Sequence, residues 1–261
     1  MDWDDAYANG AHIEGAADYP PRWAKAAEAF RAALGDNARL DLRYGDGDRA
    51  RYDLFLPQSV PAGTVVFVHG GYWRAFGRRD WSHLAAGPLA RGWAVAMPSY
   101  DLCPAVKISD ITNQIATAVQ AICAQTRGPV SLAGHSAGGH LVARMLDPLL
   151  VPEKMAGRLR AVMPISPLSD LRPLMKTQMN DDFRLTPAEA EAESPLFMTI
   201  RHPAQVTVWV GAGERPAFVD QARWLAGEWK VDLVIAPGRH HFDVIDDLQD
   251  AESDMVRRLT T

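Results

Sequence analysis

The sequence predicts an α/β fold in which a mostly parallel central sheet carries helices on both faces. Short, nearly unbroken apolar runs alternate with stretches of helical periodicity, the pattern of buried parallel strands joined by crossover helices. The 261 residues, 48% hydrophobic and 23% charged, suit one large domain with a substantial core. We therefore expect a single domain over residues 1–261.

The first elements lie at the edge of this sheet. Residues 21–34 are amphipathic, with Pro21 in the first turn and Gly35 just past the end, which favours a helix. Residues 39–44 and 51–56 alternate apolar and polar side chains around a Gly-Asp-Gly-Asp linker. This alternation is typical of an antiparallel hairpin.

The central strands and their helices follow. Pro164 is an awkward residue for a central strand because it cannot donate a ladder hydrogen bond, so one strand boundary stays open. Strands are expected over 64–68, 93–97, 130–133, 161–165, 206–210 and 231–235, and helices over 79–91, 110–126, 138–150, 217–229 and 244–259.

Residues 167–203 interrupt the alternation of strands and helices. They contain several prolines and one short helix, marked by Thr186 as N-cap, Pro187 at the first position and Glu189 completing a capping box. A long excursion between two strands suits a small lid or pocket wall over a site.

A nucleophile motif follows the strand over 130–133. Gly134-His135-Ser136-Ala137-Gly138 matches G-x-S-x-G, and a helix-compatible stretch comes after it. This strand–turn–helix setting holds a serine hydroxyl exposed on a sharp turn, and the glycines avoid collisions with neighbouring backbone. The helix N-terminus also favours developing negative charge. We predict that Ser136 is the nucleophile.

The loop after the strand over 64–68 is suited to an oxyanion hole. It reads His69-Gly70-Gly71-Tyr72-Trp73, and a loop at this position supplies backbone N–H groups to a tetrahedral intermediate. We assign Gly71, Tyr72 and Ala137 as donors, and expect His69 to brace the loop. Tyr72 and Trp73 are expected to wall a pocket.

A base and an acid are available in the order that this fold uses. His240 and His241 follow the last strand, and either ring could reach Ser136. Glu214 is the only carboxylate in the loop after the strand over 206–210, so we assign it as the acid that orients the imidazole. Asp170 stays open as the alternative acid.

Taken together, these motifs resemble the kynurenine formamidase (arylformamidase) branch of the α/β hydrolases. The resemblance covers roughly residues 65–245 and also includes Pro98–Pro104, Ser166–Leu171, Ser194-Pro195 and His241-Phe242-Asp243. It implies Ser136 as nucleophile and, because the family's base directly precedes Phe-Asp, His241 as base. The acid region departs from the family pattern at Arg215 and Ala217, which affects the pocket rim.

This resemblance implies hydrolysis of a small acyl amide through an acyl-enzyme, with N-formyl-kynurenine as the leading substrate. Trp73, Tyr100 and residues 167–203 are then candidates to line the leaving-group site. A general carboxylesterase or thioesterase would use the same constellation. A non-catalytic binding protein on the same scaffold is the remote alternative.

Charge and composition exclude several other classes of function. A net charge of −5 without dense basic runs argues against nucleic-acid binding. The eight histidines lack metal-ligand spacing, so we expect neither a metal nor another cofactor. Two cysteines give no disulfide framework. The acidic N-terminus and the lack of a long apolar run predict a cytoplasmic enzyme without membrane contact, and a homodimer is left open.

Overall fold

The computed structural model describes residues 2–200 and 202–261. Its strands are β1 Ala38–Arg43, β2 Arg51–Phe55, β3 Thr64–Val68, β4 Ala94–Pro98, β5 Val130–His135, β6 Leu159–Ile165, β7 Gln205–Gly211 and β8 Asp232–Ala236. Its α-helices are α1 Trp3–Ala6, α2 Tyr19–Leu34, α3 Ala86–Ala90, α4 Ile108–Gln125, α5 Ala137–Arg144, α6 Glu153–Ala156, α7 Asn180–Phe183, α8 Pro187–Glu193, α9 Pro216–Trp229 and α10 Asp254–Leu259. Short 3₁₀ turns lie at Gly10–His12, Ala16–Asp18, Gly35–Asn37, Arg78–Asp80, Ser82–Ala85, Arg172–Lys176, Pro195–Phe197 and Asp246–Gln249.

The strands form one sheet in the order β1-β2-β4-β3-β5-β6-β7-β8. Only the edge pairs β1–β2 and β2–β4 are antiparallel in the described sheet, and the remaining pairs are parallel. The predicted fold class and edge hairpin are therefore confirmed. β6 continues through Pro164, and its pairing with β7 includes Ala161↔Gln205 and Val162↔Val206 and then resumes at Ile165↔Trp209. The residue without an N–H thus lies where this ladder is interrupted.

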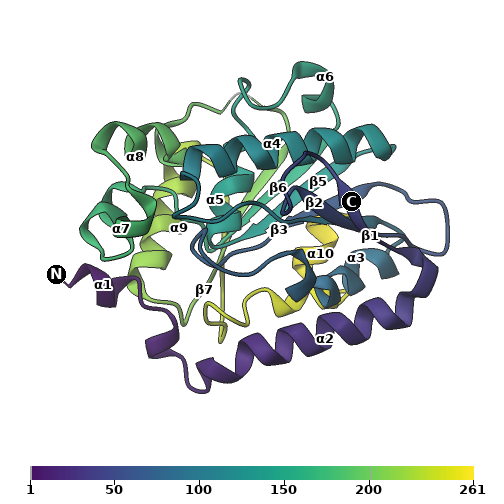
Figure 1. The fold of residues 1–261 in the computed structure, drawn as a ribbon, viewed down its shortest axis with the longest axis horizontal. Coiled ribbons are helices and arrows are strands. Elements are labelled where there is room, and N and C mark those ends of the chain that lie inside the picture. Colours follow the sequence, from purple (N-terminus) through teal and green to yellow (C-terminus); the bar gives the residue numbers. More distant parts are fainter. Residues whose placement is uncertain (1, 201) are drawn as a thin grey trace.

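Helices cover both faces of the sheet (Figure 1). One core cluster joins α4, α5 and α9 to the sheet through side chains such as Ile111, Leu141 and Phe218. The other joins α2, α3 and α10 to the opposite face, through Trp23 and Val256 among others. The apolar strands are therefore buried on both sides, which is the reason that they read as unbroken hydrophobic runs.

Three predicted helices are shorter in the structure than the sequence suggests. The stretch over 79–91 is two 3₁₀ turns followed by the short α3, because Pro88 lacks an N–H and Gly87 packs closely on the backbone of Leu248. The stretch over 138–150 ends with α5, before Pro148. The stretch over 244–259 is a 3₁₀ turn and α10, which begins where the Ser253 hydroxyl accepts a hydrogen bond from the Val256 N–H.

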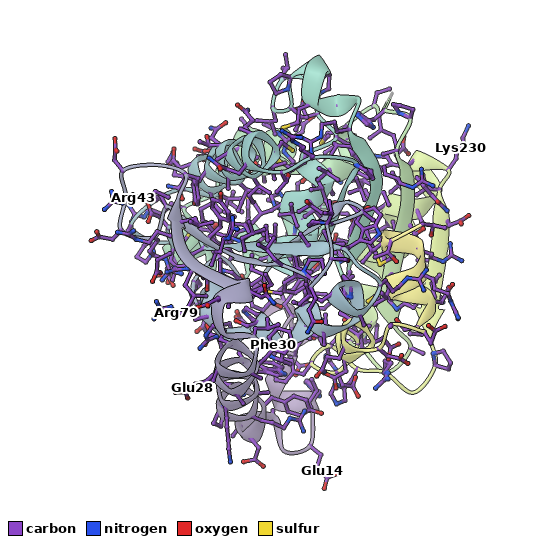
Figure 2. All side chains as sticks on the ribbon, turned by 90° about the vertical axis from the view of Figure 1, so that its right-hand side faces the viewer. Glu14, Glu28, Phe30, Arg43, Arg79 and Lys230 are labelled. Carbon is purple, nitrogen blue, oxygen red and sulfur yellow. The ribbon has the colours of Figure 1, made fainter. Side chains whose placement is uncertain are left out.

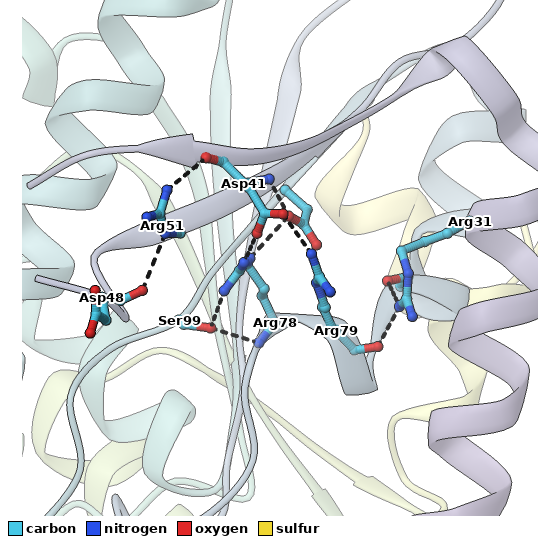
Figure 3. A network of polar contacts seen from close by, with 9 residues as sticks. Arg31, Asp41, Asp48, Arg51, Arg78, Arg79 and Ser99 are labelled. Carbon is cyan, nitrogen blue, oxygen red and sulfur yellow. Dashed lines mark hydrogen bonds and ion pairs between the residues drawn. The ribbon is translucent and has the colours of Figure 1, made fainter.

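A network of charged side chains fixes the antiparallel edge of the sheet (Figure 3). Asp41 sits in a bulge of β1 with φ of 62°, and its N–H donates to Asp53 Oδ1 at 2.9 Å. Arg78 Nε donates to the same oxygen at 3.0 Å, and its guanidinium also contacts Asp41. Because the Asp53 side chain is fully buried, its charge needs these partners.

The N-terminal segment runs along the outside of the domain before β1. Figure 2 shows Glu14 and Glu28 pointing away from the protein along this segment, whereas Phe30 of α2 turns toward the sheet. Phe30 packs edge-to-face on Phe55 of β2, with ring centroids 6.0 Å apart. One face of α2 is therefore held on the sheet.

Candidate active site

The tight turn between β5 and α5 presents Ser136. The serine adopts φ of 56° and ψ of −116°, a strained conformation for a residue with a side chain. A Cβ at Gly134 would lie 2.1 Å from the Gly138 carbonyl oxygen, and one at Gly138 would lie 2.0 Å from the Val68 oxygen. Only glycine fits at these two positions, because the start of α5 is pressed against the sheet.

We expect Gly138→Ala to lower the free energy of unfolding by at least about 1–3 kcal/mol, because its methyl group would overlap the backbone of β3. Gly227→Ala is the matched control. A Cβ there meets nothing within 4 Å on the exposed side of α9, so the change should stabilise the helix by about 1 kcal/mol. Urea unfolding measures both variants. Equal stabilities would contradict the close contact at Gly138.

His241 and Glu214 form a buried pair beside this turn. His241 Nδ1 lies 2.6 Å from Glu214 Oε2, and the exposed fractions of the two side chains are only 5% and 0%. The other carboxylate oxygen accepts hydrogen bonds from the Ser166 hydroxyl and, at 2.8 Å, from the Gly211 N–H. Each Glu214 oxygen thus has a partner, and the carboxylate is held toward the imidazole.

The alternative acid and the alternative base have other partners. Asp170 accepts hydrogen bonds from the Arg172 guanidinium at 2.8–3.2 Å. His240 contacts the Tyr19 hydroxyl at 3.0 Å and the Asp243 carboxylate at 3.2 Å. The geometry therefore favours the Glu214–His241 pair over the two alternatives that the sequence left open.

Ser136 and His241 line one cavity of about 430 Å³. Within the described residues Ser136 Oγ has no hydrogen-bond partner, so the serine–histidine hydrogen bond is not formed in this structure. Such bonds are often long in unliganded enzymes and shorten when substrate binds. The shared cavity still brings together the residues from which the sequence predicts nucleophilic chemistry.

The predicted oxyanion donors lie at the same cavity. Gly71 and Tyr72 line it, with φ of 103° and 51°, and Ala137 is the first residue of α5. Among the described residues, the N–H groups of these three residues have no acceptor. They are therefore available as donors to a substrate oxygen.

Trp73 and Tyr100, predicted to line the pocket, lie outside the cavity. Both are fully buried. Trp73 packs edge-to-face between His140 and Phe183, and Tyr100 stacks on His69 and donates its hydroxyl to the His69 carbonyl at 2.9 Å. They support the loop from beneath, because close packing of the loop on the core leaves no space beside their rings. His69 braces the loop from the core, and burial lowers its pKa to about 3.

Tyr72 lines the cavity, and much of the remaining wall comes from residues that the sequence did not single out as lining. Residues from the N-terminal segment line the same cavity as Ser136, and within the described part of the expected lid over 167–203 only Met179 does so. Four rings of the aromatic wall come from three distant parts of the chain: Trp23, the pair Phe76 and Trp81, and Phe242. The i, i+4 pair of Tyr19 and Trp23 is a local sequence signal for part of this wall, because the two rings pack edge-to-face with centroids 5.5 Å apart.

His135 is a second residue that the sequence analysis missed. Its ring packs on His241 with centroids 4.6 Å apart, and its Nε2 lies 2.9 Å from the His241 carbonyl oxygen. Burial lowers the pKa of His135 well below its usual range, and the neighbouring His241 lowers it further. His135 is therefore neutral, and its Nε2–H donates to the loop that carries His241.

No group of three or more His, Cys, Asp or Glu side chains in the described residues could hold a metal ion. None of the described helices is both long and apolar enough to cross a bilayer.

Comparisons with known proteins agree with this fold. A family model described as the alpha/beta hydrolase fold matches residues 65–231. The structure of a Silicibacter sp. TM1040 protein, provisionally named a thioesterase, is 62% identical over the full length of both chains, with a TM-score of 0.99. The kynurenine formamidase of Drosophila melanogaster is 29% identical over 84% of this chain and 79% of its own, and that of Salmo salar is 25% identical over 84% and 80%. The chain therefore belongs to the family of hydrolases with the alpha/beta hydrolase fold.

Proposed function

We propose that this serine hydrolase cleaves small acyl amides or esters through an acyl-enzyme on Ser136, with arylformamides such as N-formyl-kynurenine as its preferred substrates. The observation that carries the proposal is the buried Glu214–His241 pair, which lies at the same aromatic-walled cavity as a serine on a strained turn. Similarity to relatives named kynurenine formamidase supports the substrate class.

In the first half-reaction Ser136 Oγ attacks the carbonyl carbon while His241 Nε2 takes the hydroxyl proton. Glu214 holds the Nδ1–H of His241 and stabilises the resulting imidazolium. The oxyanion accepts hydrogen bonds from main-chain N–H groups of Gly71, Tyr72 and Ala137, each typically worth 10²–10³ in rate. The imidazolium then gives its proton to the leaving nitrogen or oxygen, and the bond from carbon to the leaving group breaks.

In the second half-reaction a water molecule attacks the acyl-enzyme. His241 accepts the water proton and returns a proton to Ser136 Oγ as the carbon–oxygen ester bond breaks. The products are a carboxylic acid, formic acid for a formamide, and regenerated serine. The same residues therefore serve both halves of the reaction.

The cavity wall supports an aromatic leaving group of neutral or positive charge. Trp23, Phe76, Trp81 and Phe242 provide the apolar surface, and Asp4 places a carboxylate at the edge. Among the described lining residues there is no Lys or Arg. An anionic substrate therefore gains no charge pairing inside the cavity.

A thioesterase is the second candidate function. Its support is the 62% identity to the Silicibacter protein provisionally named a thioesterase. The same nucleophile, base and oxyanion donors would cleave a thioester, so the two candidates differ only in the leaving group that the cavity accepts.

A substrate panel should separate the candidates. We expect kcat/KM for N-formyl-kynurenine to exceed that for acetyl-CoA by at least about 100-fold, because the aromatic wall and the lack of lining cations suit the arylformamide, and about 2.7 kcal/mol of differential binding gives this ratio. 4-Nitrophenyl acetate serves as a general ester control. An ester or thioester preferred over the formamide by several orders of magnitude would overturn the formamidase assignment.

A further inference from the structure

Asn9 lies on the N-terminal segment at the edge of the catalytic cavity. Only 5% of the residue is exposed, and it lines the same cavity as Ser136 and His241. A polar side chain in such a place normally has its hydrogen bonds satisfied by neighbouring groups.

Neighbouring hydrogen bonds fix the orientation of the Asn9 carboxamide. The Tyr72 hydroxyl donates its proton to the Tyr7 carbonyl oxygen at 2.6 Å. Its oxygen can therefore only accept from Asn9, whose Nδ2 lies 3.5 Å away. The NH₂ group of the Asn9 side chain must therefore face Tyr72. The acceptor Oδ1 then lies on the other side of the carboxamide.

Asn9 Oδ1 is buried and has no hydrogen-bond partner among the described residues. An unsatisfied buried acceptor costs about 1–3 kcal/mol. Four other cavity side chains have such atoms: the indole N–H groups of Trp23 and Trp81 are donors, Ser136 Oγ is the nucleophile, and His135 Nδ1 lies beside the backbone of Gly70. Asn9 Oδ1 is thus an acceptor that a bound substrate could satisfy.

We propose that Asn9 Oδ1 accepts a hydrogen bond from the N–H of the scissile amide, and that this contact makes the enzyme prefer amides over the corresponding esters. The inference rests on the proposed hydrolysis at Ser136. It deepens that function by assigning the residue that recognises the leaving nitrogen.

The chemistry of the leaving group explains the preference. When Ser136 attacks an amide, the nitrogen becomes tetrahedral and its lone pair must turn toward the proton on His241. The N–H then points elsewhere and needs an acceptor, which Asn9 provides. His241 transfers its proton to the nitrogen, and the C–N bond breaks. The amine leaves while its original N–H still donates a hydrogen bond to Asn9 Oδ1. An ester oxygen carries no hydrogen, so the contact stabilises only the amide transition state.

The test compares 4-nitroformanilide with 4-nitrophenyl formate, which share the acyl group and the ring. We expect Asn9→Leu to lower kcat/KM for the formanilide about 10–100-fold, which corresponds to about 1.4–2.7 kcal/mol, and to change kcat/KM for the ester less than about threefold. Asn9→Asp keeps an acceptor and should keep the amide-to-ester ratio within about threefold of the wild type. Asn113→Leu, on the exposed side of α4, is the matched control and should leave both rates unchanged.

The outcomes separate this inference from the proposed function. Thermal unfolding checks that each variant is folded, and Asn9→Ala replaces Asn9→Leu if the larger side chain prevents folding. Three outcomes would overturn the role of Asn9 and leave hydrolysis at Ser136 standing. They are equal losses of activity on both substrates, no loss on either substrate, and an Asn9→Asp variant that has lost the amide preference. A folded wild type that cleaves neither substrate would overturn the proposed function, and the inference with it.

Discussion

Replacing Ser136 with alanine is expected to lower kcat by about 10⁴–10⁶-fold while the protein stays folded. The hydroxyl is the only group on the β5–α5 turn that can form the acyl-enzyme, and without it only the oxyanion donors and substrate binding contribute. Initial rates with N-formyl-kynurenine and 4-nitrophenyl acetate measure the loss. A fluorophosphonate should modify the wild type at Ser136, detected by peptide mass spectrometry, and should leave Ser136→Ala unmodified.

The control for this variant is Ser131→Ala in the same strand. Ser131 is also fully buried, and its hydroxyl likewise has no partner among the described residues, but it does not line the cavity. We expect its activity to stay within about threefold of the wild type. If Ser136→Ala kept a tenth of the wild-type rate, the assigned nucleophile would be wrong.

Glu214→Gln is expected to reduce kcat by about 10³–10⁴-fold with little change in KM. The glutamine keeps the shape of the glutamate and can still accept hydrogen bonds from Ser166 and Gly211 at one oxygen. Its NH₂ group would then face His241 Nδ1, where it forces the tautomer in which Nε2 carries the proton. That imidazole cannot accept the proton of Ser136. Steady-state kinetics at neutral pH measures this loss.

Asp170→Asn is the companion variant, because Asp170 is the acid at the alternative position. Its carboxylate pairs with the half-exposed Arg172 guanidinium, so we expect kcat to change less than about fivefold. The opposite pattern, a large loss for Asp170→Asn and a small one for Glu214→Gln, would transfer the role of acid to Asp170. Circular dichroism and thermal unfolding establish that both variants are folded.

The features predictable from sequence are those with a local physical signature. Strands such as β3 and β5 were found because burial on both faces demands continuous apolar residues. The turn at Ser136 was found because only glycine fits on either side of it. The Glu214–His241 contact could also be anticipated, since both loops follow the carboxyl ends of neighbouring parallel strands.

The cavity wall could not be predicted in the same way. Trp73 belongs to the oxyanion loop and Tyr100 follows strand β4, yet the sequence does not reveal toward which side of that loop their rings turn. Asn9 contacts Tyr72, which lies 63 positions further along the chain, and Trp23 contacts the still more distant Phe242. Such contacts depend on how the N-terminal segment and α2 pack on the domain. No local sequence pattern around Asn9 predicts this packing.

The cavity draws on residues that lie far apart in the chain, from Asn9 to His241. During synthesis on the ribosome, the turn that carries Ser136 is made before the loop that carries His241. A chain truncated before β8 would therefore hold a serine without its base, and hydrolytic competence requires that the polypeptide be made and folded through His241.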